Sequence, residues 1–191
     1  MRLPAIIATL ILAATPPLAA EPAHYLLEPD KSVVAFETDF GGGAALITGR
    51  MPVLAADLTI DFTQVAASHV NVTLDVAHAS TSNPLATEAM MGARVLDISH
   101  FPQITFSSTS IRPAGEGAAI AGNLTIRGVT LPVTLAAQIY RQKGTAEGDR
   151  NALSILLTGT VSRSAFGASG FPDMVGDDVR LKILARIRRD G

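Results

Sequence analysis

Cysteine and tryptophan are both absent from this chain of 191 residues. Without thiols the protein has no disulfide, no thiolate nucleophile and no Cys-ligated zinc site, so packing and backbone hydrogen bonds must supply its stability. Charged residues are also scarce, at 17% of the sequence, and their formal net charge is only −2. Because nucleic-acid binding requires a clear excess of positive charge, we expect no nucleic-acid partner.

The N-terminal segment has the composition of a targeting signal. Residues 1–20 carry one charge, Arg2, followed by an apolar run from Leu3 to Ala14 and a small-residue end. This layout is typical of a secretory signal peptide, and we expect cleavage after Ala20. An uncleaved membrane anchor is the alternative, although the apolar run is shorter than the roughly 20 residues that span a bilayer. Residues 21–191 then suit a single domain with a sizeable core.

Apolar and polar residues alternate through most of the remaining chain. Near the C-terminus, for example, Val179 and Leu181 alternate with Arg180 and Lys182. Side chains of a strand point alternately to opposite faces, so this period predicts strands with one dry face and one solvated face. One short early segment is also compatible with a loop, and Arg112–Gly115 is expected to form a turn. The nine expected strands are Ser32–Asp39, Ala45–Met51, Ala55–Asp61, Val70–Ala77, Gln103–Ile111, Ala118–Ile126, Thr130–Arg141, Leu153–Val161 and Asp178–Arg188.

One segment departs from this pattern and predicts a short helix. Asn83 and Pro84 suit an N-cap and the first helical position, and the expected helix is Leu85–Ala93. Leu85 and Ala89 share a face at helical spacing. The sequence therefore predicts an all-β protein, an antiparallel barrel of about eight strands with one short helix capping an end. A β-sandwich with the same strands is the alternative that the pattern alone leaves open.

Several separated blocks resemble a known family. They are YLLEPDKSVVAF at Tyr25–Phe36, FPQITFSST at Phe101–Thr109, GNLTIRGVTLPVTL at Gly122–Leu135 and VGDDVRLKI at Val175–Ile183. In this order they are similar to the YceI-like family of bacterial periplasmic polyisoprenoid-binding proteins. The resemblance implies a lipocalin-like barrel rather than a sandwich, a periplasmic location and a possible homodimer. It also implies a long isoprenoid or other lipid, such as a prenylquinone tail, as the partner.

The dry face of the strands is the candidate binding surface. From composition alone, a barrel of this size can be filled solid or can hold one slender ligand. The resemblance implies the second, and each buried CH₂ of a hydrocarbon chain contributes roughly 0.8 kcal/mol without any hydrogen bond. The expected ligand-binding residues are Val34, Phe36, Leu74, Val76, Leu85, Met90, Met91, Phe106, Leu124, Ile126, Val133, Leu135, Phe166, Leu181 and Ile183.

Some positions differ from the family pattern. Lys31 and Phe40 stand where the family has histidines, and residues 86–90 replace its Arg-Asp-x-His-Leu motif in the helix. Val95 and Leu96 replace a pair of phenylalanines. These changes make the helix more apolar and remove most of the polar groups expected near the mouth of the barrel, so they argue against a polar contact to a quinone head group and indicate a different ligand.

No metal or catalytic set is evident in the sequence. The histidines His24, His69, His78 and His100 lack the i, i+2 or i, i+4 spacing that brings two ligands to one metal. Serines and threonines are common, yet none lies in a G-x-S-x-G elbow. We therefore expect no metal, no cofactor and no enzymatic activity.

The segment from Arg163 to Gly167 resembles the family's Arg-x-x-Phe-Gly motif. There Phe166 is expected to plug a barrel end and Arg163 to pair with a carboxylate. The leading interpretation is a periplasmic binding or carrier protein for a long apolar ligand. One alternative is a non-catalytic stress-protective or interaction module with a solid barrel core. Another is an enzyme acting on a hydrophobic substrate through Arg163 and Asp177.

Overall fold

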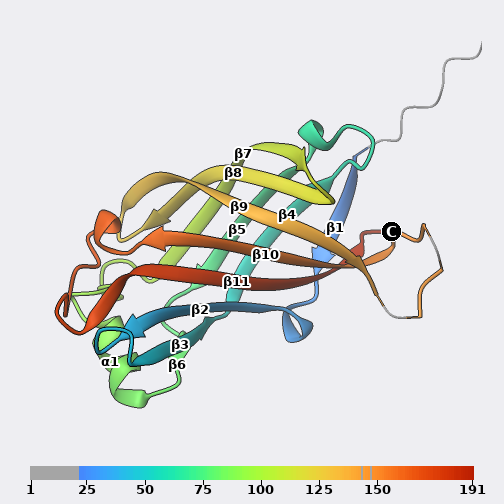
Figure 1. The fold of residues 1–191 in the computed structure, drawn as a ribbon. Helices are drawn as coiled ribbons and strands as arrows, with labels where there is room; N and C mark the ends of the chain where they lie inside the picture. The colour runs from blue at the N-terminus through green and yellow to red at the C-terminus, as the bar shows by residue number, and fades with distance from the viewer. Residues whose placement is uncertain (1–21, 143, 147) are drawn as a thin grey trace, which may run out of the picture.

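A single antiparallel sheet of eleven strands curls round and closes on itself (Figure 1). The computed structural model describes residues 22–142, 144–146 and 148–191, so the predicted signal peptide, residues 1–20, lies outside the described residues. The strands are β1 (Ala23–Leu27), β2 (Val33–Phe40), β3 (Ala45–Met51), β4 (Val53–Ile60), β5 (His69–Asp75), β6 (Ser80–Thr81), β7 (Gln103–Ala114), β8 (Gly117–Ile126), β9 (Val129–Arg141), β10 (Ala152–Ser162) and β11 (Val175–Arg189).

The first six strands form three pairs, and the two members of each pair are segments of one longer, interrupted strand. The 3-10 turn η1 (Pro29–Lys31) separates β1 from β2, and both pair with β11. Pro52 separates β3 from β4, while residues 76–79 separate β5 from β6. Counted in this way, eight strands run up and down in chain order, and the pairing of β1 with β11 closes the ring. The predicted antiparallel barrel is therefore confirmed.

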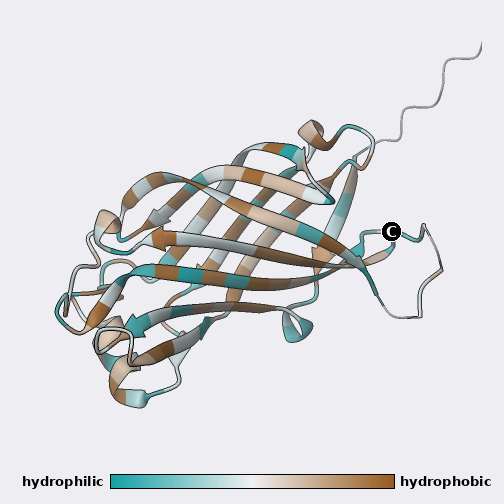
Figure 2. Cartoon of the chain, viewed as in Figure 1, coloured by the Kyte–Doolittle hydropathy of each residue, from teal (hydrophilic) through white to brown (hydrophobic). Residues whose placement is uncertain are grey.

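Strand alternation determines what faces the interior. Hydrophobic and hydrophilic residues alternate along β11 and its neighbours (Figure 2). Near the end that carries α1, a buried cluster contains Leu96, Ile104 and Phe166. A second cluster, at the end near β1, contains Tyr25, Leu58 and Ile187. Full burial of an aliphatic or aromatic side chain contributes roughly 1.5–3 kcal/mol, so these two clusters stabilise opposite ends of the barrel.

The helix α1 (Pro84–Met91) covers one end of the barrel, as predicted (Figure 1). The side chain of Asn83 accepts a hydrogen bond of 2.9 Å from the backbone N–H of Leu85, which confirms the predicted N-cap. The helix ends before Gly92, two residues earlier than expected. Glycine disfavours a helix by about 1 kcal/mol, and its backbone here is extended.

The remaining differences from the predicted elements concern strand ends. All nine expected strands are present, so the short early segments are strands rather than loops. The predicted turn at Arg112–Gly115 is too long, because Pro113 and Ala114 still pair with β8. The strands β1 and β6 were not expected from the sequence. Among the described residues, no helix has the length and apolarity needed to cross a membrane.

Candidate ligand cavity

The barrel is hollow. A cavity of about 820 Å³ lies inside it, within the range of about 300–1,000 Å³ that small-molecule sites occupy. Its walls include Leu85 and Met90 of α1 at one end and Leu58 and Ile187 at the other. Between them the lining consists of inward aliphatic and phenylalanine side chains from the strands, so the cavity extends along most of the barrel.

Most of the residues expected at the binding surface do line this cavity. They are Val34, Phe36, Leu74, Leu85, Met90, Phe106, Leu124, Ile126, Val133, Leu135, Phe166, Leu181 and Ile183. Two expected residues do not. Val76 follows the last residue of β5, where strand alternation no longer applies, and packs in a core cluster at 1% exposure. Met91, the last residue of α1, is not among the residues that line the cavity.

The mouth of the cavity lies at the α1 end and has an apolar rim. Phe40, Leu46, Leu85 and Met174, which we call the mouth rim, all line the cavity and remain 39–74% exposed. They come from the ends of β2 and β3, from α1 and from the loop before β11. A backbone hydrogen bond of 2.8 Å from Gly41 to the Met174 carbonyl joins two of these segments. Large apolar side chains that remain accessible in this way mark the opening of the cavity.

Part of the mouth rim escaped the sequence interpretation. Phe40 continues the inward phase of Val34 and Phe36, but the expected strand ended one residue too early. Leu46 does not follow the alternation that marks the inward residues of β3, so the sequence pattern did not indicate it. Met174 lies in a loop, where no periodicity indicates which way a side chain points.

The opposite end of the barrel is filled by side chains. Tyr25, Leu58, Leu153 and Ile187 are all at most 8% exposed. The Tyr25 hydroxyl donates a hydrogen bond of 2.8 Å to the carbonyl of Arg150. Burial raises the pKa of the Tyr25 phenol, which keeps it neutral. The cavity therefore has one open end and one closed end.

The buried and half-buried polar side chains that border the cavity are engaged elsewhere. Ser32 donates its hydroxyl to the Glu28 carbonyl at 2.8 Å, and Thr38 donates to the Gly176 carbonyl at 3.0 Å. In the described part of the chain, every buried side-chain nitrogen or oxygen has a hydrogen-bond partner. The cavity wall therefore offers apolar contact and leaves no buried polar group waiting for a ligand.

Arg163 is one of these engaged groups. Its guanidinium donates to four backbone carbonyls, including those of Gly170 at 2.7 Å, Val175 at 2.8 Å and Gly176 at 2.8 Å; the fourth acceptor is Ala168. The expected pairing of Arg163 with a carboxylate is therefore wrong, because all three nitrogens of its guanidinium donate to backbone carbonyls of residues 168–176. Phe166 is buried at the α1 end and lines the cavity, as expected.

Asp177, the other residue of the enzyme hypothesis, also has local partners. Its carboxylate accepts hydrogen bonds from the Ser162 hydroxyl and from the backbone N–H of Ser164 at 2.9 Å. These bonds, the one from Ser162 most of all, lower the pKa of Asp177. The carboxylate thereby anchors the start of η3 (Ser164–Phe166).

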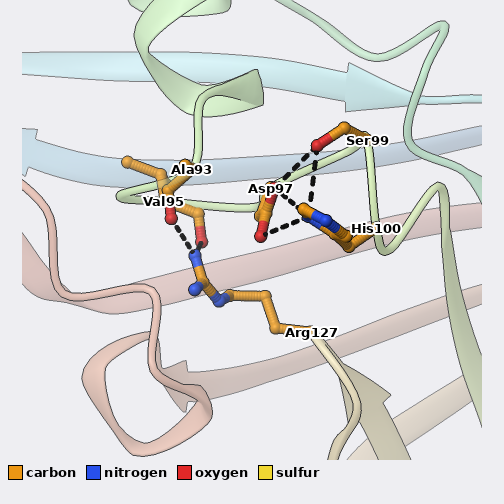
Figure 3. A network of polar contacts seen from close by, with 6 residues as sticks. All are labelled: Ala93, Val95, Asp97, Ser99, His100 and Arg127. Atoms are coloured by element: carbon orange, nitrogen blue, oxygen red, sulfur yellow. Dashed lines mark hydrogen bonds and ion pairs between the residues drawn. The ribbon is translucent and has the colours of Figure 1, made fainter.

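A serine, a histidine and an aspartate lie together in the loop after α1 (Figure 3). Asp97 accepts hydrogen bonds from Ser99 at 2.9 Å and from Nδ1 of His100 at 3.0 Å, and the His100 contact lowers the pKa of Asp97. In a nucleophilic triad the hydroxyl and the carboxylate contact different ring nitrogens. Here Ser99 lies 3.3 Å from the same Nδ1 that contacts Asp97, so the group fastens the loop.

Arg127 fastens the same loop from the β8–β9 turn (Figure 3). Its Nη1 donates hydrogen bonds of 2.7 Å to the carbonyls of both Ala93 and Val95. Because Val95 lines the cavity, these two bonds hold part of the cavity wall in place.

Two of the histidines contact neighbouring polar side chains. His78 pairs with Asp75 at 2.6 Å, and His24 contacts Thr59 at 3.1 Å. Within the described ranges, no group of three or more potential metal-ligating side chains comes together.

Comparison with known sequences supports the family resemblance. The chain matches the YceI-like domain over residues 25–187. It is 34% identical over 110 residues to a UPF0312 protein of Enterobacter sp. (strain 638), covering 58% of this chain and 57% of that relative. It is also 34% identical over 110 residues to Protein YceI of Salmonella arizonae, covering 58% of each chain. The match thus spans less than two thirds of the length of these curated relatives.

Solved structures share the fold. BcnA of Burkholderia cenocepacia superposes with a TM-score of 0.74 at 22% identity, covering 84% of this chain and 98% of that one. The YCEI protein of Campylobacter jejuni gives a TM-score of 0.59 at 24% identity, covering 74% of this chain and 84% of that one. At these identities the likeness concerns the barrel alone. Together with the domain match over most of the chain, it shows that this protein belongs to the YceI-like family.

Proposed function

We propose that this protein binds a long apolar chain inside its barrel and carries it through the periplasm. An isoprenoid, a prenylquinone tail or a similar lipid fits this description. The observation that carries the proposal is the cavity of about 820 Å³, lined along its length by aliphatic and phenylalanine side chains. Each CH₂ buried there contributes roughly 0.8 kcal/mol, so a long chain gains affinity without specific polar contacts.

The two unlike ends of the cavity support one orientation of the ligand. Tyr25, Leu58 and Ile187 fill the closed end, where a polar head group would lose its hydration. The mouth rim borders solvent at the other end. A chain that enters tail first therefore leaves its polar head at the mouth rim.

The periplasmic carrier role has two further supports. The first 20 residues have the layout of an export signal. Arg163 and Asp177 are occupied by local hydrogen bonds, which favours binding over catalysis. A homodimer, implied by the family resemblance, stays a prediction.

The proposal is tested by binding and by recovery of the native ligand. Native mass spectrometry of protein purified from its bacterial host is expected to show a co-purifying lipid. Leu124→Trp, which adds volume inside the cavity, is expected to weaken binding of a fluorescent polyene fatty acid at least about tenfold. Asn123→Trp, exposed on the outer face of the same strand, serves as the matched control.

Two results would count against this function. One is a protein that carries no lipid and binds no apolar probe in its folded state. The other is a Leu124→Trp variant that binds the probe as tightly as the unmodified protein does. The second outcome would favour the interaction-module alternative, in which the barrel is only a scaffold.

A further inference from the structure

Three glycines occupy inward positions of the barrel wall, and each is covered by a large side chain. A Cβ atom at Gly122 would lie 2.5 Å from Cζ of Phe106, and one at Gly159 would lie 2.6 Å from Cδ2 of Leu135. At Gly49 the ring of Phe36 takes the same place. A Cβ atom and a side-chain carbon cannot lie this close together. The three covering side chains can therefore lie flat against the wall only because the glycines have no Cβ.

Two of these glycines lie in one row of paired residues that crosses four neighbouring strands. Gly159 pairs with Leu181, Leu181 pairs with Phe36, and Phe36 pairs with Gly49. Leu135 lies against Gly159 from the adjoining strand. We call these five residues, from β9, β10, β11, β2 and β3, the waist.

The waist lies midway along the cavity. On β11 it is marked by Leu181, between Val175 at the mouth and Ile187 at the closed end. Ile187 lies six positions after Leu181, or about 20 Å along the strand at roughly 3.3 Å per residue. Cavity-lining residues lie on both sides, such as Met174 towards the mouth and Leu58 towards the closed end. A ligand can therefore reach the closed half only through the waist.

An eight-stranded barrel is just wide enough for inward side chains to fill it. Full-sized side chains in place of the two glycines would therefore take up space that the cavity now has. With two glycines present, Phe36 and Leu135 fold sideways over the neighbouring strands instead of pointing at the centre. The Gly122–Phe106 pair does the same on the β7–β8 side of the barrel.

We propose that Gly49 and Gly159 determine which ligands the protein accepts by holding the waist open. The ligand is then a chain long enough to thread the waist and occupy both halves of the cavity, rather than a compact molecule held near the mouth. This inference rests on the proposed function and adds a lower limit on the length of the ligand.

Gly159 offers the cleanest test of the waist. A side chain at Gly49 would meet the Ser80 carbonyl at 2.7 Å, and one at Gly122 would meet the Ser107 carbonyl at 2.6 Å, so both substitutions would disturb the backbone. At Gly159 the first obstacle is the movable end of Leu135, and the nearest backbone oxygen is 3.4 Å away. Valine suits a strand, so Gly159→Val is expected to fold and to push Leu135 towards the axis.

The experiment measures Kd by calorimetry for straight-chain primary alcohols of increasing length. For the unmodified protein, Kd is expected to fall about fourfold with each added CH₂ until both halves of the cavity are filled. For Gly159→Val, short alcohols are expected to bind as before, while Kd stops falling once the chain reaches the waist. The longest alcohols should then bind at least about a hundredfold more weakly than they bind the unmodified protein.

Two further variants separate a blocked waist from a damaged fold. Thr160→Val places the same side chain on the exposed outer face of β10 and should leave the length dependence unchanged. Leu135→Ala, added to Gly159→Val, makes room at the waist and should restore the binding of long chains. If the unmodified protein binds alcohols and Gly159→Val shows the same dependence on chain length, the waist inference alone is overturned. Unmodified protein that binds no alcohol would overturn both this inference and the proposed function.

Discussion

Arg163 holds the loop between β10 and β11 through backbone carbonyls rather than through an ion pair. The residue is 9% exposed, and its guanidinium reaches four carbonyls within residues 168–176. A planar fork with five N–H donors suits several acceptors spread around it, and its charge persists when buried. The same loop supplies Phe171 and Met174 to the cavity wall. One buried side chain thereby fixes part of the mouth.

Replacement of this residue by lysine tests that role. Arg163→Lys leaves three donors on one nitrogen for four separated carbonyls, so at least one buried acceptor loses its bond. We expect the free energy of unfolding to fall by about 2–4 kcal/mol, measured as a lower urea midpoint with an unchanged slope. Arg188→Lys, on an exposed position of β11, should change it by less than about 0.5 kcal/mol. Equal stability of the two variants would contradict the role.

At the scale of elements, steady alternation made the long strands predictable. The bounds of β3 were predicted without error, and β11 was found apart from its first three residues and its last. The strands β1 and β6 were missed because they have five and two residues, too few for a period to show. Their strand conformation depends on pairing with distant partners, β11 and β4 for β1 and β3 for β6.

The same distinction, between features set by local alternation and features set by distant contacts, applies to the cavity. Inward residues within strands, such as Leu124 and Leu181, follow from phase alone. Met174 could not be predicted, because hydrogen bonds between loops decide where it points. The cover of Gly159 by Leu135 depends on the register between β9 and β10, which no local pattern encodes. Sequence reasoning therefore predicted the walls of the cavity, but at the mouth rim only Leu85, and at the waist neither glycine.

The helix α1 is the element whose stability can be changed most selectively. Asn83→Ala removes the hydrogen bond to the Leu85 N–H, and loss of such a cap costs about 1 kcal/mol. Because α1 lies beside the barrel wall rather than within it, we expect faster amide hydrogen exchange in residues 85–91 with no change in β7 and β8. Asn123→Ala, exposed on β8, is the control. Unchanged exchange in α1 would show that the packing of Met90, rather than the cap, stabilises the helix.

At the scale of the whole molecule, the barrel combines a well-filled end with an empty interior. Tyr25, Leu58 and Ile187 pack tightly near the closing pair β1–β11. Further along, inward side chains face a cavity and lose the dispersion contacts that a filled core would give them. A ligand chain supplies those contacts only when the barrel is folded. Ligand binding and stability are therefore linked.

This linkage gives a quantitative expectation for thermal unfolding. A ligand that binds only the folded state at about 100 times its Kd stabilises that state by about 2.7 kcal/mol. For a domain of this size, Tm rises roughly 2–4 °C per kcal/mol, so calorimetry should show a rise of roughly 5–11 °C with a long-chain alcohol. In Gly159→Val the same concentration of that alcohol should give a much smaller rise, whereas a short alcohol should raise Tm equally in both proteins. An unchanged Tm at concentrations that saturate binding would mean that the alcohol binds the unfolded chain as well as the folded one, which a ligand held inside the barrel cannot do.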